Sequence, residues 1–225
     1  MANYWGEITA TIDWCEPNYV VTPYIAEFWN TVSNLAYILL GCYGLYQVRH
    51  LESRFKGAFL ALILVGLGSS CFHGTLKWTG QLSDEISMFM VSFILTYILL
   101  EQKSKVSSPP YLLIGIFIIL VGLYTVLQWV ILFQATWLVL TVGIAIRFMQ
   151  LMPPSQRLKY WRVLYLFLGA AICWLLEQLL CDIYPPVAYL HAFCWHIGTA
   201  ITTYKVIMGC VRQRERTRRK QMFQA

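Results

Sequence analysis

Charged side chains are scarce in this sequence: Asp, Glu, Lys and Arg make up 12% of its 225 residues, whereas 58% of the residues are hydrophobic. An average soluble domain carries about 25% charged residues, so the composition excludes that class. The mean hydropathy of +0.57 is too high for a soluble protein with one anchoring helix, because the apolar residues are spread along the whole chain. The sequence therefore predicts an integral membrane protein.

The sequence also lacks an internal repeat, a low-complexity linker and a second polar domain. Residues 1–30 lack the apolar core of a cleaved signal peptide, so we expect the first membrane span to act as an uncleaved anchor. We expect a single membrane domain over residues 1–225, with a polar segment at 1–30 and a basic tail at 211–225.

Apolar runs of about 20 residues are long enough to cross a bilayer as helices. The runs are continuous, which favours helices over the alternating strands of a β-barrel. The boundary between the fourth and fifth runs depends on Gln128 and Gln134. The pattern predicts an all-α bundle of seven transmembrane helices, near residues 31–48, 57–76, 86–101, 111–128, 131–147, 160–180 and 187–209.

Positive charge gathers on one side of the predicted bundle. Of the 17 Lys and Arg residues, all except Lys77 fall on this side. They lie in the loops after spans one, three and five, with Lys105 in the second of these loops, or toward the carboxyl end. The positive-inside rule places that side in the cytoplasm, so we expect a luminal or exterior amino terminus and a cytoplasmic carboxyl terminus. The basic tail lacks interleaved aromatic side chains, so we interpret it as a topology signal near anionic lipid and expect no nucleic-acid binding.

Three histidines lie toward the luminal ends of the predicted spans: His73 in the second, and His191 and His196 in the seventh. An imidazole in a membrane needs hydrogen-bond partners, and bonding between helices is the simpler interpretation of a lone histidine. Three histidines at a similar depth, with carboxylates at the same level, favour a metal instead. Three histidines and a water form the open tetrahedral site of catalytic zinc.

Ser69 and Asp84 are predicted to lie beside His73. Ser69 precedes His73 by four residues, so the two share a helix face, and we expect Asp84 to open the third span. A nucleophilic triad of serine, histidine and aspartate is therefore an alternative to a metal. The triad leaves His191 and His196 without a role, so we favour the metal site.

The segment DWCEPNY carries closely spaced oxygen donors in Asp13, Glu16 and Asn18, and Glu27 follows at the start of the first span. Several oxygens of this kind suit calcium, which takes about six to eight of them. The alternative is a polar loop that caps the first helix. No EF-hand pattern is present, so the spacing leaves both interpretations open.

Four motifs resemble the alkaline ceramidase family, and within it the third mammalian type: DWCEPNY, YIAEFWNTVSN, GLGSSCFHGTLKWTGQLSDE and YLHAFCWHI. The resemblance is dense through residues 4–90, looser across the middle spans, and strong again around WLLEQLLCD and the seventh span. It implies a seven-helix membrane amidase that hydrolyses ceramide to sphingosine and a free fatty acid. It also implies a wider kinship with adiponectin-receptor-like proteins.

The family's motifs imply roles for individual residues. The zinc ligands by motif are His73, His191 and His196, with Ser69 and Asp84 beside the metal. The calcium ligands by motif are Asp13, Trp14 through its backbone carbonyl, Glu16, Asn18 and Glu27. Zinc would polarise the amide carbonyl and activate the attacking water, Asp84 would pass a proton to the leaving amine, and Ser69 would donate to the developing oxyanion. A hydrogen bond from Ser69 to a metal ligand is the alternative.

Two other functions fit the same resemblance. A receptor of the related seven-helix group would hold zinc with little turnover, and a non-catalytic lipid-binding protein would take the lipid without metal. Short polar loops leave little surface for a protein partner, so we favour the enzyme, with ceramide as its membrane partner and no obligate protein partner. Arg-rich tails occur on proteins of the endoplasmic reticulum and Golgi, where we expect this protein.

The family pattern places the last two histidines four residues apart. Here HAFCWH separates His191 and His196 by five residues. On a regular α-helix, a spacing of four leaves two side chains about 40° apart, and a spacing of five about 140°. We therefore predict a wide, π-type turn between the two histidines. In a regular helix, one of them would not be a ligand.

Cys15 and Cys181 both fall on the predicted luminal side, where oxidising conditions permit a disulfide over the mouth of the bundle. Two free thiols are the alternative. Glu177 is a buried carboxylate near the depth of the histidines, where the family carries an aspartate. We favour an ordinary partner on a neighbouring helix for Glu177 over a hydrogen bond to a metal ligand.

Overall fold

The computed structural model describes residues 4–103 and 110–222, so Lys105 and the ends of the predicted polar segment and basic tail lie outside the described residues. Every regular element in the described part is a helix, which confirms the all-α fold class. The elements are α1 (Phe28–Ser33), α2 (Leu35–Gln47), α3 (Ser53–Thr75), α4 (Trp78–Leu100), η1 (Glu101–Lys103), α5 (Tyr111–Leu127), α6 (Val130–Leu151), α7 (Pro154–Leu180), η2 (Pro185–Ala188), η3 (His191–His196) and α8 (Ile197–Met222).

Four helices, α3, α4, α6 and α7, are long and apolar enough to cross a membrane. The apolar helix α5 is shorter, at 17 residues. Many side chains of α5 and α6 point outward and are exposed, among them Ile118, Ile131 and Val139, which suits a surface in contact with lipid. These helices confirm a membrane protein, and the count of seven spans and the sides of the termini stay predictions.

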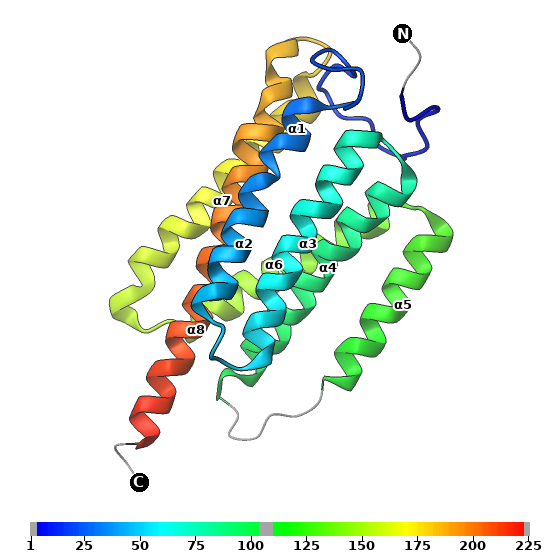
Figure 1. Ribbon diagram of the computed structural model, residues 1–225. Helices are drawn as coiled ribbons and strands as arrows, with labels where there is room; N and C mark the ends of the chain where they lie inside the picture. Colours follow the sequence, from blue (N-terminus) through cyan, green and yellow to red (C-terminus); the bar gives the residue numbers. More distant parts are fainter. Residues whose placement is uncertain (1–3, 104–109, 223–225) are drawn as a thin grey trace.

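The helices run roughly along one direction, with α3 between α2 and α4 and with α7 beside α8 (Figure 1). The N-terminal segment lies at the same end of the bundle as α1, and the C-terminal half of α8 lies at the opposite end. Aromatic and aliphatic side chains such as Phe55, Phe59 and Leu62 of α3 are buried in the largest core cluster.

Two glycines bring the backbones of α3 and α4 close together. A Cβ atom added at Gly68 would lie 2.8 Å from the backbone of Ser83 and Asp84, and one at Gly80 would lie 2.8 Å from the Cα of Phe72. Small residues at such crossings let helices approach in a membrane. The close approach sets the chemistry-bearing residues of α3 directly against those of α4.

Some element boundaries differ from the predicted ones. The helix α4 begins at Trp78, after a two-residue turn in which Leu76 adopts a left-handed conformation (φ 52°), so Asp84 lies inside α4 and does not open it. The separation of the fourth and fifth runs is confirmed, because α5 ends before Gln128, which is also left-handed (φ 52°). The predicted basic tail continues α8 as far as Met222.

Candidate metal centre

Three buried histidines converge at one end of the bundle. One ligand atom from each of His73, His191 and His196 can be chosen so that all three lie within 4.8 Å of one another. Within residues 4–103 and 110–222, no other group of three or more His, Cys, Asp or Glu side chains has this geometry. His73 comes from α3, and the other two come from η3. The structure therefore brings the three predicted zinc ligands together.

The local backbone explains how two histidines five residues apart can face one site. The element η3 is a π-helix from His191 to His196. A π-helix closes its hydrogen bonds over one more residue than an α-helix, so a spacing of five brings side chains to the same side. The ring centroids of His191 and His196 lie 4.6 Å apart. The predicted wide turn is confirmed.

Each of the three imidazoles is held through its Nδ1 atom by a side chain from another part of the chain. The pairs are His73 with Glu27 (Oε2, 2.5 Å), His191 with Glu177 (Oε2, 2.9 Å) and His196 with Ser33 (Oγ, 2.7 Å). Carboxylates or hydroxyls in these positions orient a ligating histidine and select its tautomer. The arrangement leaves the three Nε2 atoms for a ligand, so the donor set fits a metal such as zinc.

Ser69 and Asp84 share a cavity of about 380 Å³ with the three histidines. Both side chains line this cavity beside His73, and the Nδ1 atom of His73 pairs with Glu27. A nucleophilic triad requires the histidine between the serine and the acid. Glu27 occupies the Nδ1 position that Asp84 would need in such a triad, so the observed contact disfavours a triad of Ser69, His73 and Asp84.

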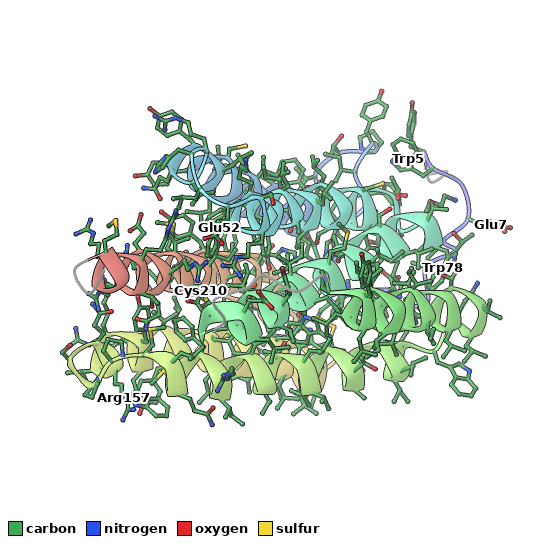
Figure 2. All side chains as sticks on the ribbon, turned by 90° about the horizontal axis from the view of Figure 1, so that it is seen from below. Trp5, Glu7, Glu52, Trp78, Arg157 and Cys210 are labelled. Atoms are coloured by element: carbon green, nitrogen blue, oxygen red, sulfur yellow. A yellow bond between two sulfur atoms is a disulfide. The ribbon has the colours of Figure 1, made fainter. Side chains whose placement is uncertain are left out.

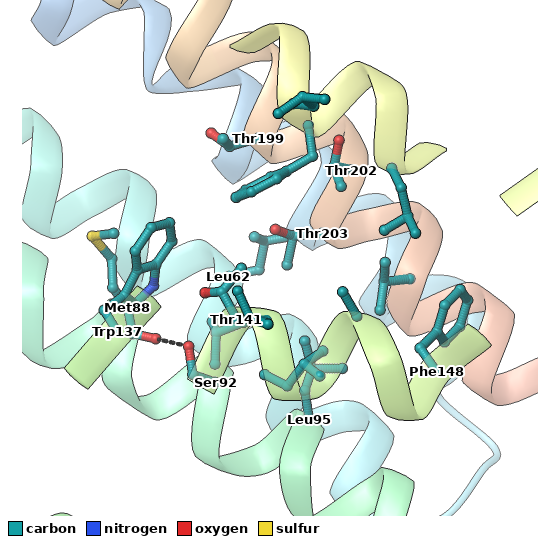
Figure 3. Close-up of a pocket in the computed structure, with 18 of the residues that line it drawn as sticks. Leu62, Met88, Ser92, Leu95, Trp137, Thr141, Phe148, Thr199, Thr202 and Thr203 are labelled. Atoms are coloured by element: carbon teal, nitrogen blue, oxygen red, sulfur yellow. Dashed lines mark hydrogen bonds between the residues drawn. The ribbon is translucent and has the colours of Figure 1, made fainter. Parts of the chain in front are cut away.

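A second cavity, of about 350 Å³, shares Tyr37, Met88 and Trp195 with the first and is mostly apolar. Figure 3 shows its walls, with hydroxyl groups from α4, α6 and α8 among the apolar side chains. One of these hydroxyls, on Ser92, donates to the carbonyl of Met88 at 2.9 Å. The two cavities together provide an apolar space that begins at the histidines and continues along the bundle.

The predicted calcium residues lie in the N-terminal segment close to the histidines. The Asn18 Nδ2 donates to Asp13 (Oδ1, 3.1 Å), and the Asn18 Oδ1 is buried without a hydrogen-bond partner. The Trp14 amide donates to Glu27 (Oε1, 3.0 Å), so Glu27 links this segment to His73. The donor types fit a calcium ion, and an oxygen without a partner is available to it.

Glu16 has a second partner that bears on the alternative interpretation. Its two carboxylate oxygens accept the amides of Trp29 (2.7 Å) and Asn30 (2.8 Å) in the first turn of α1. Glu16 therefore caps this helix, as the alternative predicts for the loop. Burial raises the pKa of both Glu16 and Asp13 above the usual values of their carboxyl groups, more than their hydrogen bonds lower it. A nearby cation would offset this penalty.

The N-terminal segment is attached to the bundle covalently. Cys15 and Cys181 form a disulfide with a Cα–Cα distance of 5.6 Å, as the predicted topology permits. The Glu27 amide also donates to the carbonyl of His73 at 2.9 Å. The segment is thus held over the end of the bundle at which the histidines lie.

A family model for ceramidases matches residues 6–224 of the chain. The chain belongs to the ceramidase family. Curated relatives include alkaline ceramidase 3 of Mus musculus, 37% identical over 91% of this chain and 84% of the relative. A putative alkaline ceramidase of Dictyostelium discoideum is 32% identical (89% and 85%), and an alkaline ceramidase of Arabidopsis thaliana is 30% identical (91% and 84%). The family resemblance stated from the motifs is confirmed.

Within this ceramidase-family chain, the role of Glu177 corrects the interpretation that we favoured. The carboxylate is fully buried and bonds His191, and its other oxygen accepts the Cys15 amide at 3.4 Å. Of the two interpretations of Glu177, the hydrogen bond to a candidate metal ligand is therefore correct. The longer side chain, where the family carries an aspartate, still reaches the histidine.

One contact of the site was missed by sequence reasoning, and one carboxylate was expected only at the level of the histidines. Ser33 lies within the motif YIAEFWNTVSN, but only the packing of α1 against η3 shows that it reaches His196. Glu85 also lines the cavity of the histidines, and its Oε2 is buried without a hydrogen-bond partner, while its Oε1 accepts from Gln81 at 3.2 Å. The position of Glu85 next to Asp84 in the sequence was the signal that it lies near the histidines.

Proposed function

We propose that this chain hydrolyses the amide bond of ceramide to sphingosine and a free fatty acid at the three-histidine site. The observation that carries the proposal is the convergence of His73, His191 and His196 in a chain of the ceramidase family. The apolar cavities beside the histidines support a substrate with two aliphatic chains. A membrane lipid can enter such a space from the bilayer.

The Nε2 atoms of the three histidines would hold a zinc ion. Zinc in such a site acts as a Lewis acid and lowers the pKa of a bound water to about 7. Glu27, Glu177 and Ser33 hold the imidazoles in one orientation through their Nδ1 atoms. This preorganisation supports metal binding without movement of the helices.

Asp84 and Ser69 are the residues that we propose for proton transfer and charge stabilisation. Asp84 lines the cavity next to the histidines and would take up a proton and deliver it to the leaving nitrogen of the amide. Ser69 lines the same cavity and would donate its hydroxyl hydrogen to the oxygen of the scissile carbonyl as negative charge develops there. The glycine-mediated contact of α3 with α4 sets the distance between the two groups.

We also propose a calcium site formed by Asp13, Glu16, Asn18, Glu27 and the carbonyl of Trp14. The unpartnered Asn18 oxygen and the Asp13 carboxylate beside it support this site. Glu27 would then belong to the calcium site and orient His73 at the same time. Calcium would stabilise the N-terminal segment over the site.

For the membrane, we propose seven spans with a luminal amino terminus and a cytoplasmic carboxyl terminus. The spans would be α1 with α2, then α3, α4, α5, α6 and α7, and finally η3 with the first part of α8. The disulfide supports an oxidising compartment on the N-terminal side, such as the lumen of the endoplasmic reticulum or Golgi. The basic residues of α8 support a cytoplasmic location for the other end.

The decisive experiment measures zinc and turnover on the same samples. The detergent-purified protein and His196→Ala would be compared by elemental analysis and by hydrolysis of a ceramide, with His50→Ala, an exposed histidine far from the site, as the matched control. We expect one zinc per chain and full turnover in the protein and the control, and loss of both in His196→Ala. Zinc without turnover in the unaltered protein would favour a receptor, and lipid binding without zinc would favour a lipid-binding protein.

A further inference from the structure

A basic pocket lies at the end of the bundle opposite the histidines. It has a volume of about 490 Å³ and lies between the start of α3, the last turns of α4 and the basic part of α8. The residues that line it are Glu52, Ser53, Arg54, Gly57, Ile94, Tyr97 and Arg214. Figure 2 shows Glu52 and Cys210 toward this end, and Trp5, Glu7 and Trp78 toward the other. The volume is within the range of about 300–1,000 Å³ typical of small-ligand sites.

The guanidinium group of Arg54 is the unusual feature of this pocket. Its side chain is only 8% exposed, and its Nε and Nη1 atoms are buried without a hydrogen-bond partner. Its Nη2 pairs with Glu52. Buried guanidinium donors are costly to leave unpaired. Arg54 also lines the pocket, so an acceptor bound there would pair with these donors after a small turn of the side chain.

The charges around the pocket identify the kind of acceptor. One oxygen of Glu52 pairs with Arg54, and the other pairs with Arg214 (Nε to Oε1, 2.9 Å). One carboxylate thus holds two guanidinium groups, so these three side chains carry a net positive charge. The C-terminal part of α8 adds further arginines nearby in sequence, including Arg212 and Arg216, both exposed. A forked guanidinium with two free donors matches the oxygens of a phosphate group.

The position of the pocket indicates where such a group would come from. It opens where α3 begins, α4 nears its end and the apolar part of α8 gives way to its basic part. Phosphates of lipid headgroups occupy this level of a membrane, and basic segments beside membrane helices attract anionic lipids. Inorganic phosphate in solution offers the same acceptor oxygens, so it is a second possible source of the group.

We infer that the pocket between the start of α3, the end of α4 and α8 binds free phosphate or a phosphomonoester, and not the diester of an ordinary headgroup, through Arg54 and Arg214. The group fills the two free donors of Arg54, while Glu52 keeps both guanidinium groups in position. This site is independent of the proposed hydrolase activity, because it lies at the other end of the bundle. Its test therefore needs no measurement of turnover.

The test uses the full chain in detergent and follows its thermal unfolding midpoint during titration with three probes: dioctanoyl phosphatidylinositol 4-phosphate, dioctanoyl phosphatidylcholine and inorganic phosphate. We expect the phosphorylated lipid to raise the midpoint saturably and phosphatidylcholine to have no such effect. A saturable response to inorganic phosphate would support the site with a soluble source, and a response to the lipid alone would support it with a membrane source. Equal stabilisation by phosphatidylcholine would overturn the inference.

Three variants separate this site from general attraction to basic charge. Arg54→Gln should weaken binding by about tenfold or more, since a charge-assisted hydrogen-bond fork is lost. Glu52→Gln should tighten binding, because it removes a negative charge beside the phosphate while the amide oxygen can still accept from a guanidinium group. Arg216→Gln, which removes an exposed arginine of the same helix, should change the affinity by less than about threefold. Equal weakening by Arg216→Gln and Arg54→Gln would contradict a defined site.

Gly57→Leu tests the pocket without removing a charge. A Cβ added at Gly57 has only the Cδ1 of Ile94 near it, at 3.9 Å, and Gly57 lines the pocket, so we expect a leucine there to extend into the pocket. We expect it to fold and to lose the saturable response to the phosphorylated lipid. A folded Gly57→Leu protein that binds as tightly as the unaltered chain would overturn the inference, even if Arg54→Gln fails to fold.

Discussion

Gly68 sets the distance between the two helices that carry Ser69, His73 and Asp84, so replacing it should affect turnover more than stability. A Cβ atom at this position would lie 2.8 Å from the backbone of Ser83 and Asp84. Carbon atoms in ordinary contact are about 3.5 Å apart, so Gly68→Ala must move α3 and α4 apart by roughly 0.7 Å. Because the obstructing atoms are backbone, no side-chain rotation can relieve the contact.

The expected magnitude follows from two opposing effects on stability and one on activity. Overpacking costs about 1–3 kcal/mol, while alanine in a helix is more favourable than glycine by up to about 1 kcal/mol. The net loss of stability should therefore be small, about 0–2 kcal/mol. A displacement approaching 1 Å at a reacting group lowers turnover on the order of tenfold to a hundredfold.

The assay compares ceramide hydrolysis and the thermal unfolding midpoint of Gly68→Ala with those of Gly143→Ala. Gly143 of α6 has no atom within 4 Å of an added Cβ, so its alanine variant controls for helix propensity alone. We expect normal turnover and equal or higher stability in the control. Full turnover in a folded Gly68→Ala protein would refute the argument that this contact positions Asp84.

Three further predictions follow from contacts described above. Cys15→Ser should lower the free energy of unfolding by about 2–5 kcal/mol, with no further loss in the double variant with Cys181→Ser, as measured by thermal unfolding; an additive loss would contradict it. Ser33→Ala should weaken zinc binding about tenfold to a hundredfold without abolishing it, as measured by chelator competition, whereas unchanged affinity would show that the bond to His196 does not orient the ring. Burial alone would raise the pKa of Glu52, but Arg214 and Arg54 together hold it below its ordinary value. Its stabilising contribution should be present above the ordinary glutamate pKa of about 4.3 and lost as the pH falls through the lower folded value. The difference in unfolding midpoint between the protein and Glu52→Gln should therefore shrink at acid pH, and a difference that grows would reverse the sign.

Local sequence was sufficient to predict several parts of the candidate site. Continuous apolar runs led to the all-helical class, and the five-residue spacing of His191 and His196 required the π-helix that the structure contains. The disulfide of Cys15 with Cys181 was one of two outcomes that the predicted topology permitted, the other being two free thiols. These expectations rest on local spacing or on the order of spans along the chain, which the sequence contains directly.

Contacts between distant helices could not be predicted in the same way. In a membrane, all faces of a helix are apolar, so hydrophobic periodicity does not set how far a helix is rotated or how deep it sits. The bonds of Ser33 and Glu177 to their histidines depend on those two quantities, and so does the burial of Arg54 in the basic pocket. The sequence by itself determined the helices and the residues capable of the chemistry. Only the tertiary structure decided which partners hold them, because helix rotation and depth are set by packing between helices.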